Sequence, residues 1–482
     1  MTASAKAIPL RGLKRRALSL GAAKAFDHAM QFLLPVVLVR CLDTATFGEY
    51  RLLWLAIGTL MYLATFNVPQ SLFFFLPRSD ARLKRLYINQ TLLFMGASGL
   101  VCAFLVSPWN PWIPAALAPL GKYGPLVPSF VVLWLVSYVL DFLPTVDERT
   151  TWQSICSIVL AAVRVVILAV GAFFTGSMEV LLWLLVAFAL LRMAVLLFYV
   201  RRYHGLHRPL VEGALFRRQV KLAAPMGMSN ALFGMRWQAD QWIAAHLFSL
   251  ASFAAFSVAA VFGAVVNIFR TSVNDAFLPS MSRLQAAGDV RGMLELNGRA
   301  NVMVGTLLFP MLAFGFVFAE EVVTVIYTAA YLEAAQVMRL YIAAYCLMVI
   351  EVGSIVLLLD EGRYAMRVNA VALCFSVAVS LAAALTFGLW GAALGGVLAI
   401  YLDRFMILRR VAVRTGVPLR KVQDWRGLVL GLTFAAGCAT IAWHIDRALL
   451  TDRAPLERLI AGGFVLAATY GLVLFIRKTT KK

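Results

Sequence analysis

The sequence has few charged residues for its length. Only 14% of its 482 residues are charged and 62% are hydrophobic, whereas a soluble domain has about 25% and roughly 45 to 50%. Because the apolar excess extends along the whole chain, it excludes a soluble enzyme with a single membrane anchor. It also excludes a disordered chain, which would be poor in apolar residues. The composition indicates an integral membrane protein.

Cysteine and histidine are also scarce, with six and five copies. The cysteines form no CxxC motif and no Cys/His cluster, and nearly all of them lie in apolar runs. This pattern excludes a disulfide framework and predicts no metal site. His204 and His207 lie in a basic stretch, where we expect them to be solvated rather than to bind a metal.

Sequence signatures of catalysis are missing as well. The chain has no G-x4-G-K-[ST] phosphate loop and no sizeable soluble stretch, so we expect neither ATP hydrolysis nor a cofactor. The proline-rich stretch from Ser107 to Pro128 contains no carboxylate, which argues against a membrane enzyme of glycan assembly. We therefore expect a transporter without catalytic residues.

Long apolar runs are what the sequence has instead. A helix that crosses about 30 Å of hydrocarbon needs about 20 mostly apolar residues, and fourteen runs of this kind occur. They cover residues 17–40, 49–68, 86–107, 127–147, 152–174, 178–200, 221–247, 252–275, 299–319, 335–358, 364–387, 390–412, 427–445 and 457–476. We predict an all-α, polytopic membrane protein of about fourteen transmembrane helices.

Acidic residues are scarce relative to basic ones, 24 against 44, which gives a formal charge of +20. Thirty-one of the basic residues fall in the two terminal segments and the even-numbered connections, and six fall in or beside the odd-numbered ones. Basic residues in short connections favour the cytoplasmic side, so both termini are predicted to be cytoplasmic. Contact with anionic lipid head groups explains the charge without a nucleic-acid partner.

The longest basic connection follows the sixth run and suggests a half-way boundary. We predict an N-terminal six-helix bundle over residues 1–200, a cytoplasmic basic linker over 201–220, a second six-helix bundle over 221–412, and two additional helices over 427–476. A weak internal repeat supports this division, because residues 42–50 and 248–256 share their spacing of apolar and aromatic positions. Many transporters are built from two such repeats.

Short motifs beside the first and seventh runs carry a family resemblance. The stretch Arg40-Cys-Leu-Asp-Thr-Ala-Thr-Phe-Gly-Glu-Tyr50 resembles the Arg-x-Leu-x4-Phe/Tyr-Gly-x-Tyr turn of Wzx-type polysaccharide and O-antigen flippases. Asp240-Gln-Trp-Ile243, followed by Phe253-x-x-Phe256-Ser257, resembles the same family. The resemblance covers about residues 10–415. Two features depart from it: Ala254 stands where many relatives have glycine, and the last two helices exceed a twelve-helix pattern.

The resemblance implies membership of the superfamily that joins multidrug extrusion proteins, oligosaccharide-lipid flippases and the lipid II flippase. It implies two bundles in a V around a central cavity, and translocation of a polyprenyl-diphosphate-linked oligosaccharide to the outer leaflet of the bacterial inner membrane by alternating access. Exopolysaccharide, capsule or O-antigen synthesis would use such a unit, with a polysaccharide polymerase as a possible partner. A lipid II flippase and a cation-coupled multidrug antiporter remain as alternatives.

Ionisable residues inside the apolar runs are the candidate site. A charge near the bilayer centre costs at least about 2.5 to 3.5 kcal/mol, so it normally faces a cavity or a partner. Lys24 and Asp27 share one helix face, as do Arg236 and Asp240. The predicted substrate-binding residues are Lys24, Arg164, Arg192, Arg236 and Gln238, and the predicted coupling or ion-pair residues are Asp27, Asp240 and Glu351.

Each of these residues has a second interpretation. The two pairs could serve only to hold the bundles together, and Arg192 could be a packing residue close to the head groups. We expect Arg270 and Arg404, near the predicted cytoplasmic ends of their runs, to extend toward the head groups in the same way. Pro35 and Pro225, at matching places in the first and seventh runs, are predicted hinges, with static bends as the alternative.

Overall fold

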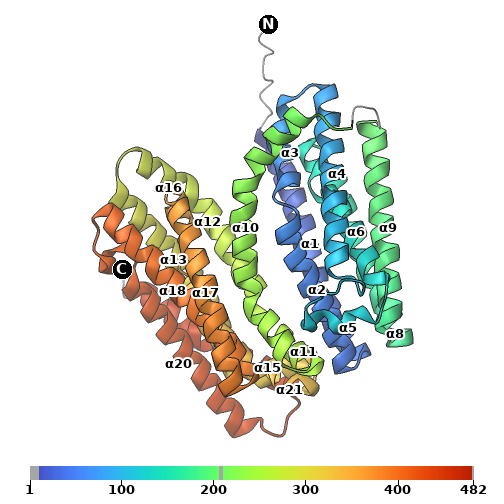
Figure 1. The fold of residues 1–482 in the computed structure, drawn as a ribbon. Coiled ribbons are helices and arrows are strands. Elements are labelled where there is room, and N and C mark those ends of the chain that lie inside the picture. The colour runs from blue at the N-terminus through green and yellow to red at the C-terminus, as the bar shows by residue number, and fades with distance from the viewer. Residues whose placement is uncertain (1–9, 206–209, 480–482) are drawn as a thin grey trace. The chain divides into compact units, whose positions relative to one another are not determined.

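The computed structural model describes residues 10–205 and 210–479, and within these ranges all regular structure is helical (Figure 1). The chain forms two compact units, Met1–Gly234 and Met235–Lys482. The prediction of an all-α, polytopic membrane protein is confirmed. Residues 1–9 and 480–482, at the predicted cytoplasmic termini, and residues 206–209 of the predicted linker lie outside the described residues.

Unit 1 contains nine α-helices and the first part of a tenth in its described residues. They are α1 (Leu10–Cys41), α2 (Thr44–Ala64), α3 (Val68–Phe75), α4 (Ala81–Leu105), α5 (Ala118–Gly121), α6 (Leu126–Ser137), α7 (Leu143–Val146), α8 (Thr150–Thr175), α9 (Met178–Tyr203) and the beginning of α10 (Gly213–Leu247). A 3-10 turn, Tyr138–Asp141, joins α6 to α7.

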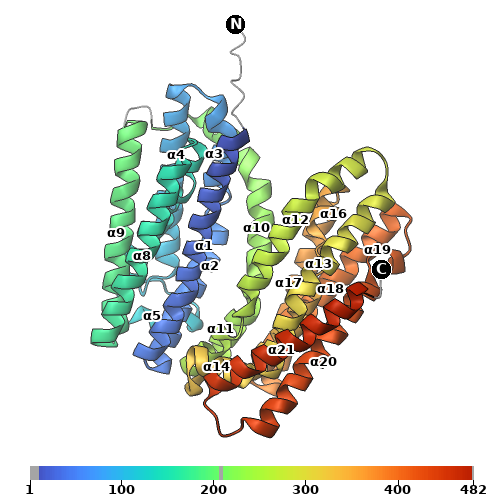
Figure 2. The same cartoon turned by 180° about the vertical axis from the view of Figure 1, so that it is seen from behind.

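The long helices of unit 1 pack lengthwise on one another. Figure 1 shows α4, α6 and α9 side by side, and Figure 2 shows α1 beside α8. Phe47, Phe130 and Tyr199 are among the largest side chains completely buried between them. In a bilayer, where lipid is as apolar as leucine, such close packing supplies much of the helix association.

Unit 2 begins within α10 and contains the remaining helices. They are α11 (Leu250–Val258), α12 (Phe262–Ala286), α13 (Val290–Val317), α14 (Ala319–Tyr327), α15 (Ala334–Met348), α16 (Gly353–Leu358), α17 (Gly362–Phe387), α18 (Leu389–Thr415), α19 (Leu419–Val422), α20 (Trp425–Leu449) and α21 (Pro455–Thr479). The two C-terminal helices pack together, α20 along α13 and α21 against α14 (Figure 2).

Helices α17 and α18 approach each other unusually closely. A Cβ atom at Gly391 would lie 2.1 Å from the carbonyl oxygen of Ala383, and one at Gly395 would lie 2.2 Å from that of Ser376. Glycine is therefore required at both positions, as in other small-residue contacts between membrane helices. This contact fixes the part of α18 that leads to the charged residues described below.

The number of membrane-spanning helices stays a prediction. In the described ranges, eleven helices are long and apolar enough to span a membrane, or twelve if α2 and α3, bent by 47°, form one span. The predicted run 221–247 lies in α10, which is not among them, and 335–358 is divided between α15 and α16. The four predicted domain ranges also remain predictions.

Irregular backbone does not coincide with the predicted hinges. Pro35 and Pro225 lie inside α1 and α10, and each helix continues through its proline. The bend between α2 and α3 instead occurs at Phe66 and Asn67, whose φ values of 44° and 60° are rare for residues other than glycine. A hinge role for the two prolines remains a prediction.

Candidate functional site

A cavity of about 640 Å³ lies inside unit 1, and four of the predicted site residues line it. They are Lys24 and Asp27 of α1, Arg164 of α8 and Arg192 of α9. Lys24 and Asp27 reach the cavity together because they are three residues apart on one helix face. Arg164 joins them because α1 packs along α8. We call this space the α1–α8 cavity.

The ion pair between α1 and α8 is loose. The Nη2 atom of Arg164 lies 3.8 Å from Oδ1 of Asp27, and the Nε2 atom of Gln31 donates to the other carboxylate oxygen at 2.7 Å. The Arg164 side chain is 10% exposed, whereas that of Asp27 is 36% exposed. A buried guanidinium thus faces a carboxylate that solvent in the cavity can reach.

Arg192, which also lines the cavity, has a closer partner. Its Nη2 atom lies 3.0 Å from both carboxylate oxygens of Asp141, at the end of the 3-10 turn after α6. The guanidinium also lies over the Trp134 ring, 4.6 Å from its centroid, in a cation–π contact. This places Arg192 in the cavity wall.

The α1–α8 cavity carries more positive than negative charge. Its three basic residues face two carboxylates, those of Asp27 and Asp141. The Nε atoms of Arg164 and Arg192 are buried and have no hydrogen-bond partner in the described part of the chain. Buried donors without a partner are costly, so the cavity favours an anion with several acceptor oxygens.

The predicted residues of α10 have a different environment in unit 2. Nη1 of Arg236 donates to Asn369 at 2.8 Å and to Asp403 at 3.0 Å, and both partners of the ion pair are buried, at 8% and 7% exposure. Asp240 accepts a 2.6 Å hydrogen bond from the Tyr341 hydroxyl. Arg236 and Asp240 therefore find partners on α15, α17 and α18.

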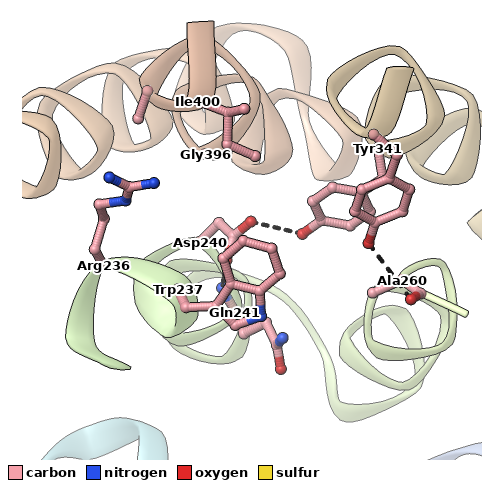
Figure 3. Close-up of a pocket in the computed structure, with 10 residues that line it drawn as sticks. Arg236, Trp237, Asp240, Gln241, Ala260, Tyr341, Gly396 and Ile400 are labelled. Carbon is pink, nitrogen blue, oxygen red and sulfur yellow. Dashed lines mark hydrogen bonds between the residues drawn. The ribbon is translucent and has the colours of Figure 1, made fainter. Parts of the chain in front are cut away.

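The space beside these two residues is small. Figure 3 shows Asp240 pointing toward Tyr341 and the Arg236 guanidinium pointing toward the helix that carries Gly396 and Ile400. The hollow between them measures about 40 Å³, room for only a few water molecules. Gln238 is half-buried on α10 and does not line the hollow, whereas Trp237 and Gln241 do.

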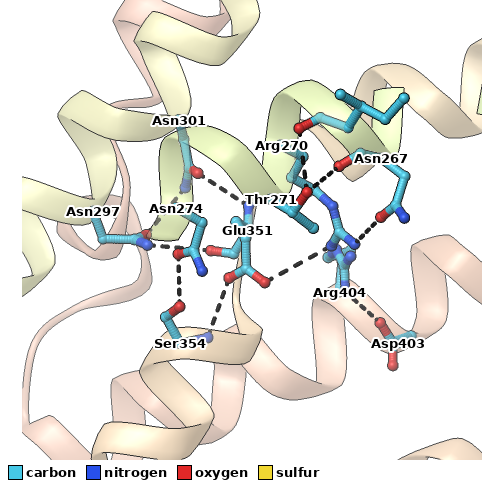
Figure 4. A network of polar contacts seen from close by, with 11 residues as sticks. Asn267, Arg270, Thr271, Asn274, Asn297, Asn301, Glu351, Ser354, Asp403 and Arg404 are labelled. Atoms are coloured by element: carbon cyan, nitrogen blue, oxygen red, sulfur yellow. Dashed lines mark hydrogen bonds and ion pairs between the residues drawn. The ribbon is translucent and has the colours of Figure 1, made fainter. Parts of the chain in front are cut away.

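Glu351 lies at the break between α15 and α16, in a polar network (Figure 4). Its carboxylate is 3.8 Å from Nη1 of Arg270 and accepts from the backbone N–H of Ser354 at 3.2 Å. Arg404 donates to Asp403 at 2.7 Å. Arg270 and Arg404 thus have partners inside unit 2, and their extension toward the head groups stays a prediction.

Asp141 and Asp403 are the partners that sequence reasoning missed. Both are acidic residues inside apolar runs, the signal that selected Asp27 and Asp240, and both would have been found by applying it to every run. His204 is a second correction, because its side chain is only 10% exposed and its Nε2 lies 2.6 Å from Oδ2 of Asp147. It is bonded rather than solvated, and His207 lies outside the described residues.

The sequence was compared with models of known protein families. The sequence model of a family described as "Polysaccharide biosynthesis protein" matches residues 37–336. The chain belongs to this family. A search of curated protein sequences finds no match.

Solved structures similar to this polysaccharide biosynthesis protein are transporters and a flippase. The lipid II flippase MurJ in an inward closed conformation has a TM-score of 0.71 at 13% identity, over 96% of this chain and 99% of that chain. An inward-facing multidrug resistance MATE transporter of the MOP superfamily has a TM-score of 0.60 at 10% identity, over 81% and 96%. The Vibrio cholerae MATE transporter VcmN, as a variant, has a TM-score of 0.54 at 12% identity, over 85% and 97%.

These likenesses show the fold. The chain is a multi-pass membrane protein of the polysaccharide biosynthesis family with the fold of MOP-superfamily transporters. The predicted resemblance to Wzx-type flippases of this superfamily is confirmed.

Proposed function

We propose that the protein is a flippase that moves a polyprenyl-diphosphate-linked oligosaccharide from the cytoplasmic to the outer leaflet of the bacterial inner membrane. The observation that carries the proposal is the α1–α8 cavity, where Lys24, Arg164 and Arg192 converge from three helices. The family, which takes part in polysaccharide biosynthesis, supports a glycan as the cargo.

The head group of such a lipid needs what this cavity offers. A diphosphate and its sugars are insoluble in hydrocarbon, so crossing requires a polar path, while the prenyl chain can stay in lipid. Guanidinium groups bind phosphate oxygens through charge-assisted hydrogen bonds. The cavity volume of about 640 Å³ falls within the range of about 300 to 1,000 Å³ that is usual for small-molecule sites.

Transfer of the head group requires the arginines to exchange partners. The 3.8 Å separation between Arg164 and Asp27 and the exposure of both carboxylates favour this exchange, because little binding energy is lost when a phosphate displaces them. Lys24 adds a third cation on the same face as Asp27. We therefore assign Lys24, Arg164 and Arg192 to head-group binding.

Alternating access of the predicted bundles, residues 1–200 and 221–412, would carry the head group across. An anion that leaves a negative-inside cell gains about 2.3 kcal/mol per charge per 100 mV, so the membrane potential can set the direction. Coupling to a cation through Asp27, Asp240 or Glu351 is a further part of the proposal. Both termini would be cytoplasmic, and a polysaccharide polymerase would receive the product.

Lipid II is the second candidate cargo, because the likeness to the MurJ structure covers almost the whole of both chains. It has the same diphosphate and differs in its sugars. A cation-coupled multidrug antiporter is a weaker candidate, although two of the similar structures are MATE transporters. Basic residues outnumber acidic ones around the α1–α8 cavity, and this favours an anionic cargo.

The test is a flipping assay with the full chain reconstituted in vesicles that contain a fluorescent polyprenyl-diphosphate oligosaccharide. We expect Arg192→Gln to slow transfer by about tenfold or more, because it removes charge-assisted hydrogen bonds to phosphate. Arg201→Gln, an exposed position at the end of the same helix, should transfer at the unsubstituted rate. No transfer by the unsubstituted protein, or equal rates for both variants, would contradict the proposal.

A further inference from the structure

A second basic pocket lies at one end of unit 1, separate from the α1–α8 cavity. It has a volume of about 300 Å³ and its charged lining comes from Lys84, Arg85, Asp147, Arg149 and His204. These residues belong to the first turns of α4, the connection between α7 and α8, and the end of α9. We call it the α4–α9 pocket. It lies at the end of the helices that carries the predicted cytoplasmic connections.

Among the residues that line the α4–α9 pocket, Asp147 carries the one carboxylate, and this group already has two hydrogen-bond partners. Oδ2 of Asp147 accepts from the Tyr199 hydroxyl at 2.8 Å and lies 2.6 Å from Nε2 of His204. The three cations of the lining, Lys84, Arg85 and Arg149, thus face an acceptor that is held by a tyrosine and a histidine. The pocket has a net positive charge.

Arg149 packs against the ring of Tyr203, which also lines the pocket. Its guanidinium carbon lies 3.7 Å from the centroid of the Tyr203 ring, a stacked arrangement that leaves the N–H groups at the edge of the guanidinium plane able to donate. Arg149 is also the N-cap of α8, and its side chain makes no hydrogen bond to the first turn of that helix. The positive end of the α8 dipole therefore adds to the field at the pocket.

The α4–α9 pocket and the α1–α8 cavity are adjacent along two helical segments. Thr145 and Gln153 line the cavity, whereas Asp147 and Arg149 line the pocket. One residue separates Thr145 from Asp147, and one helical turn separates Arg149 from Gln153. A group held in the pocket is therefore close to the wall of the cavity.

We propose that the α4–α9 pocket binds a phosphate-bearing lipid head group. Three cations around a space of this volume, at the end of a helical bundle, match the chemistry of a phosphate or diphosphate group on a lipid that lies beside the bundle. The site itself follows from the pocket, whereas assigning its occupant to the lipid-linked cargo rests on the proposed function. In that case the pocket holds the diphosphate before it enters the cavity.

The experiment measures binding, not transfer. The full chain in phosphatidylcholine nanodiscs is titrated with inorganic pyrophosphate by calorimetry, first alone and then with phosphatidylglycerol or with a polyprenyl diphosphate in the bilayer. We expect Lys84→Gln and Arg149→Gln each to weaken pyrophosphate binding by about tenfold. Arg82→Gln removes the same charge from the same turn of α4 at a position that does not line the pocket, and it should change binding less than twofold.

The two lipids identify the source of the phosphate. Competition by the polyprenyl diphosphate alone supports the cargo as the occupant, and equal competition by phosphatidylglycerol supports an anionic phospholipid in the same site. Equal weakening by Arg82→Gln and Lys84→Gln would show attraction to surface charge only and would overturn the proposal, as would an absence of pyrophosphate binding. If Lys84→Gln fails to fold, the pyrophosphate affinity of Arg149→Gln, compared with that of Arg82→Gln, tests the proposal instead. Binding without transfer would refute the proposed function while leaving the pocket intact.

Discussion

The two units contain similar buried arginines in opposite settings. In unit 1, Arg164 and Arg192 face carboxylates that are 36% and 41% exposed, inside a cavity of about 640 Å³. In unit 2, Arg236 and Arg404 share Asp403, which is 7% exposed, and the nearby hollow measures about 40 Å³. A buried arginine can thus line a cavity or hold helices together, and only its partners distinguish the two roles.

The largest expected effect follows from removing the shared carboxylate of unit 2. Asp403→Asn removes the counter-charge that Arg236 and Arg404 share, and breaking a buried pair in this way typically costs about 3 to 5 kcal/mol. We expect a large drop in the thermal midpoint of the purified protein, measured by intrinsic fluorescence. We call the ion pairs of Asp403 with Arg236 and Arg404 the unit 2 network. A midpoint within a degree of the unsubstituted protein would show that this network does not hold the helices together.

The next effect concerns transport and separates the two arginine environments. Arg164→Gln should slow oligosaccharide transfer by about tenfold or more, because it removes charge-assisted hydrogen bonds in the cavity, while the thermal midpoint changes little. Arg236→Gln should lower the thermal midpoint instead. Flipping and melting measured on the same two preparations check this, and slower transfer for Arg236→Gln at an unchanged midpoint would reverse the assignment.

A smaller effect is expected for the carboxylate that pairs with Arg192. Asp141 is 41% exposed, and ion pairs of exposed groups contribute about 0 to 1 kcal/mol. Asp141→Asn should therefore lower stability by less than about 1 kcal/mol, in contrast to Asp403→Asn. Chemical denaturation of the two variants side by side measures the difference in their free energies of unfolding. Equal losses of stability would contradict the contrast between the two units.

The smallest effect is a pH dependence at the start of α17. Glu361 precedes α17 and bonds to Arg410 at 3.0 Å and Arg414 at 2.8 Å, and the hydrogen bond from Arg410 is the main cause that lowers the pKa of its carboxyl. Because the folded pKa lies below the unfolded value near 4.5, this contribution is present above that value and is lost as the pH falls through the folded pKa. The melting difference between the unsubstituted protein and Glu361→Gln should thus be largest near pH 7 and vanish in acid. A difference that grows in acid would contradict it.

Much of this fold could be predicted from the length and spacing of the apolar runs, because hydrocarbon thickness imposes both. The sequence could also predict that several charged residues meet at one cavity, because a charge inside an apolar run normally faces a cavity or a partner. These residues are Lys24, Asp27, Arg164 and Arg192. The pairing of Arg236 with Asp403 could not be predicted, because the two residues are 167 positions apart in the sequence. Helix spacing predicts only which residues are neighbours on one helix.

The breaks in the helices were also beyond prediction from residue type. The tendency of proline to break helices predicted hinges at Pro35 and Pro225, yet α1 and α10 continue through both residues. The bend at Phe66 and Asn67 has no glycine or proline at its two left-handed residues, although Asn67 is held by a 3.1 Å hydrogen bond from Asn230 of α10. Tertiary contacts of this kind override local preference.

The central claim is that the α1–α8 cavity, and not the unit 2 network, receives the diphosphate. A structure of the full chain in nanodiscs with a polyprenyl-diphosphate-linked oligosaccharide bound tests it most directly. We expect phosphate oxygens within about 3 Å of the Arg164 or Arg192 guanidinium nitrogens, with Arg236 still paired to Asp403. A diphosphate bound beside Arg236, with Asp403 displaced, would contradict the account.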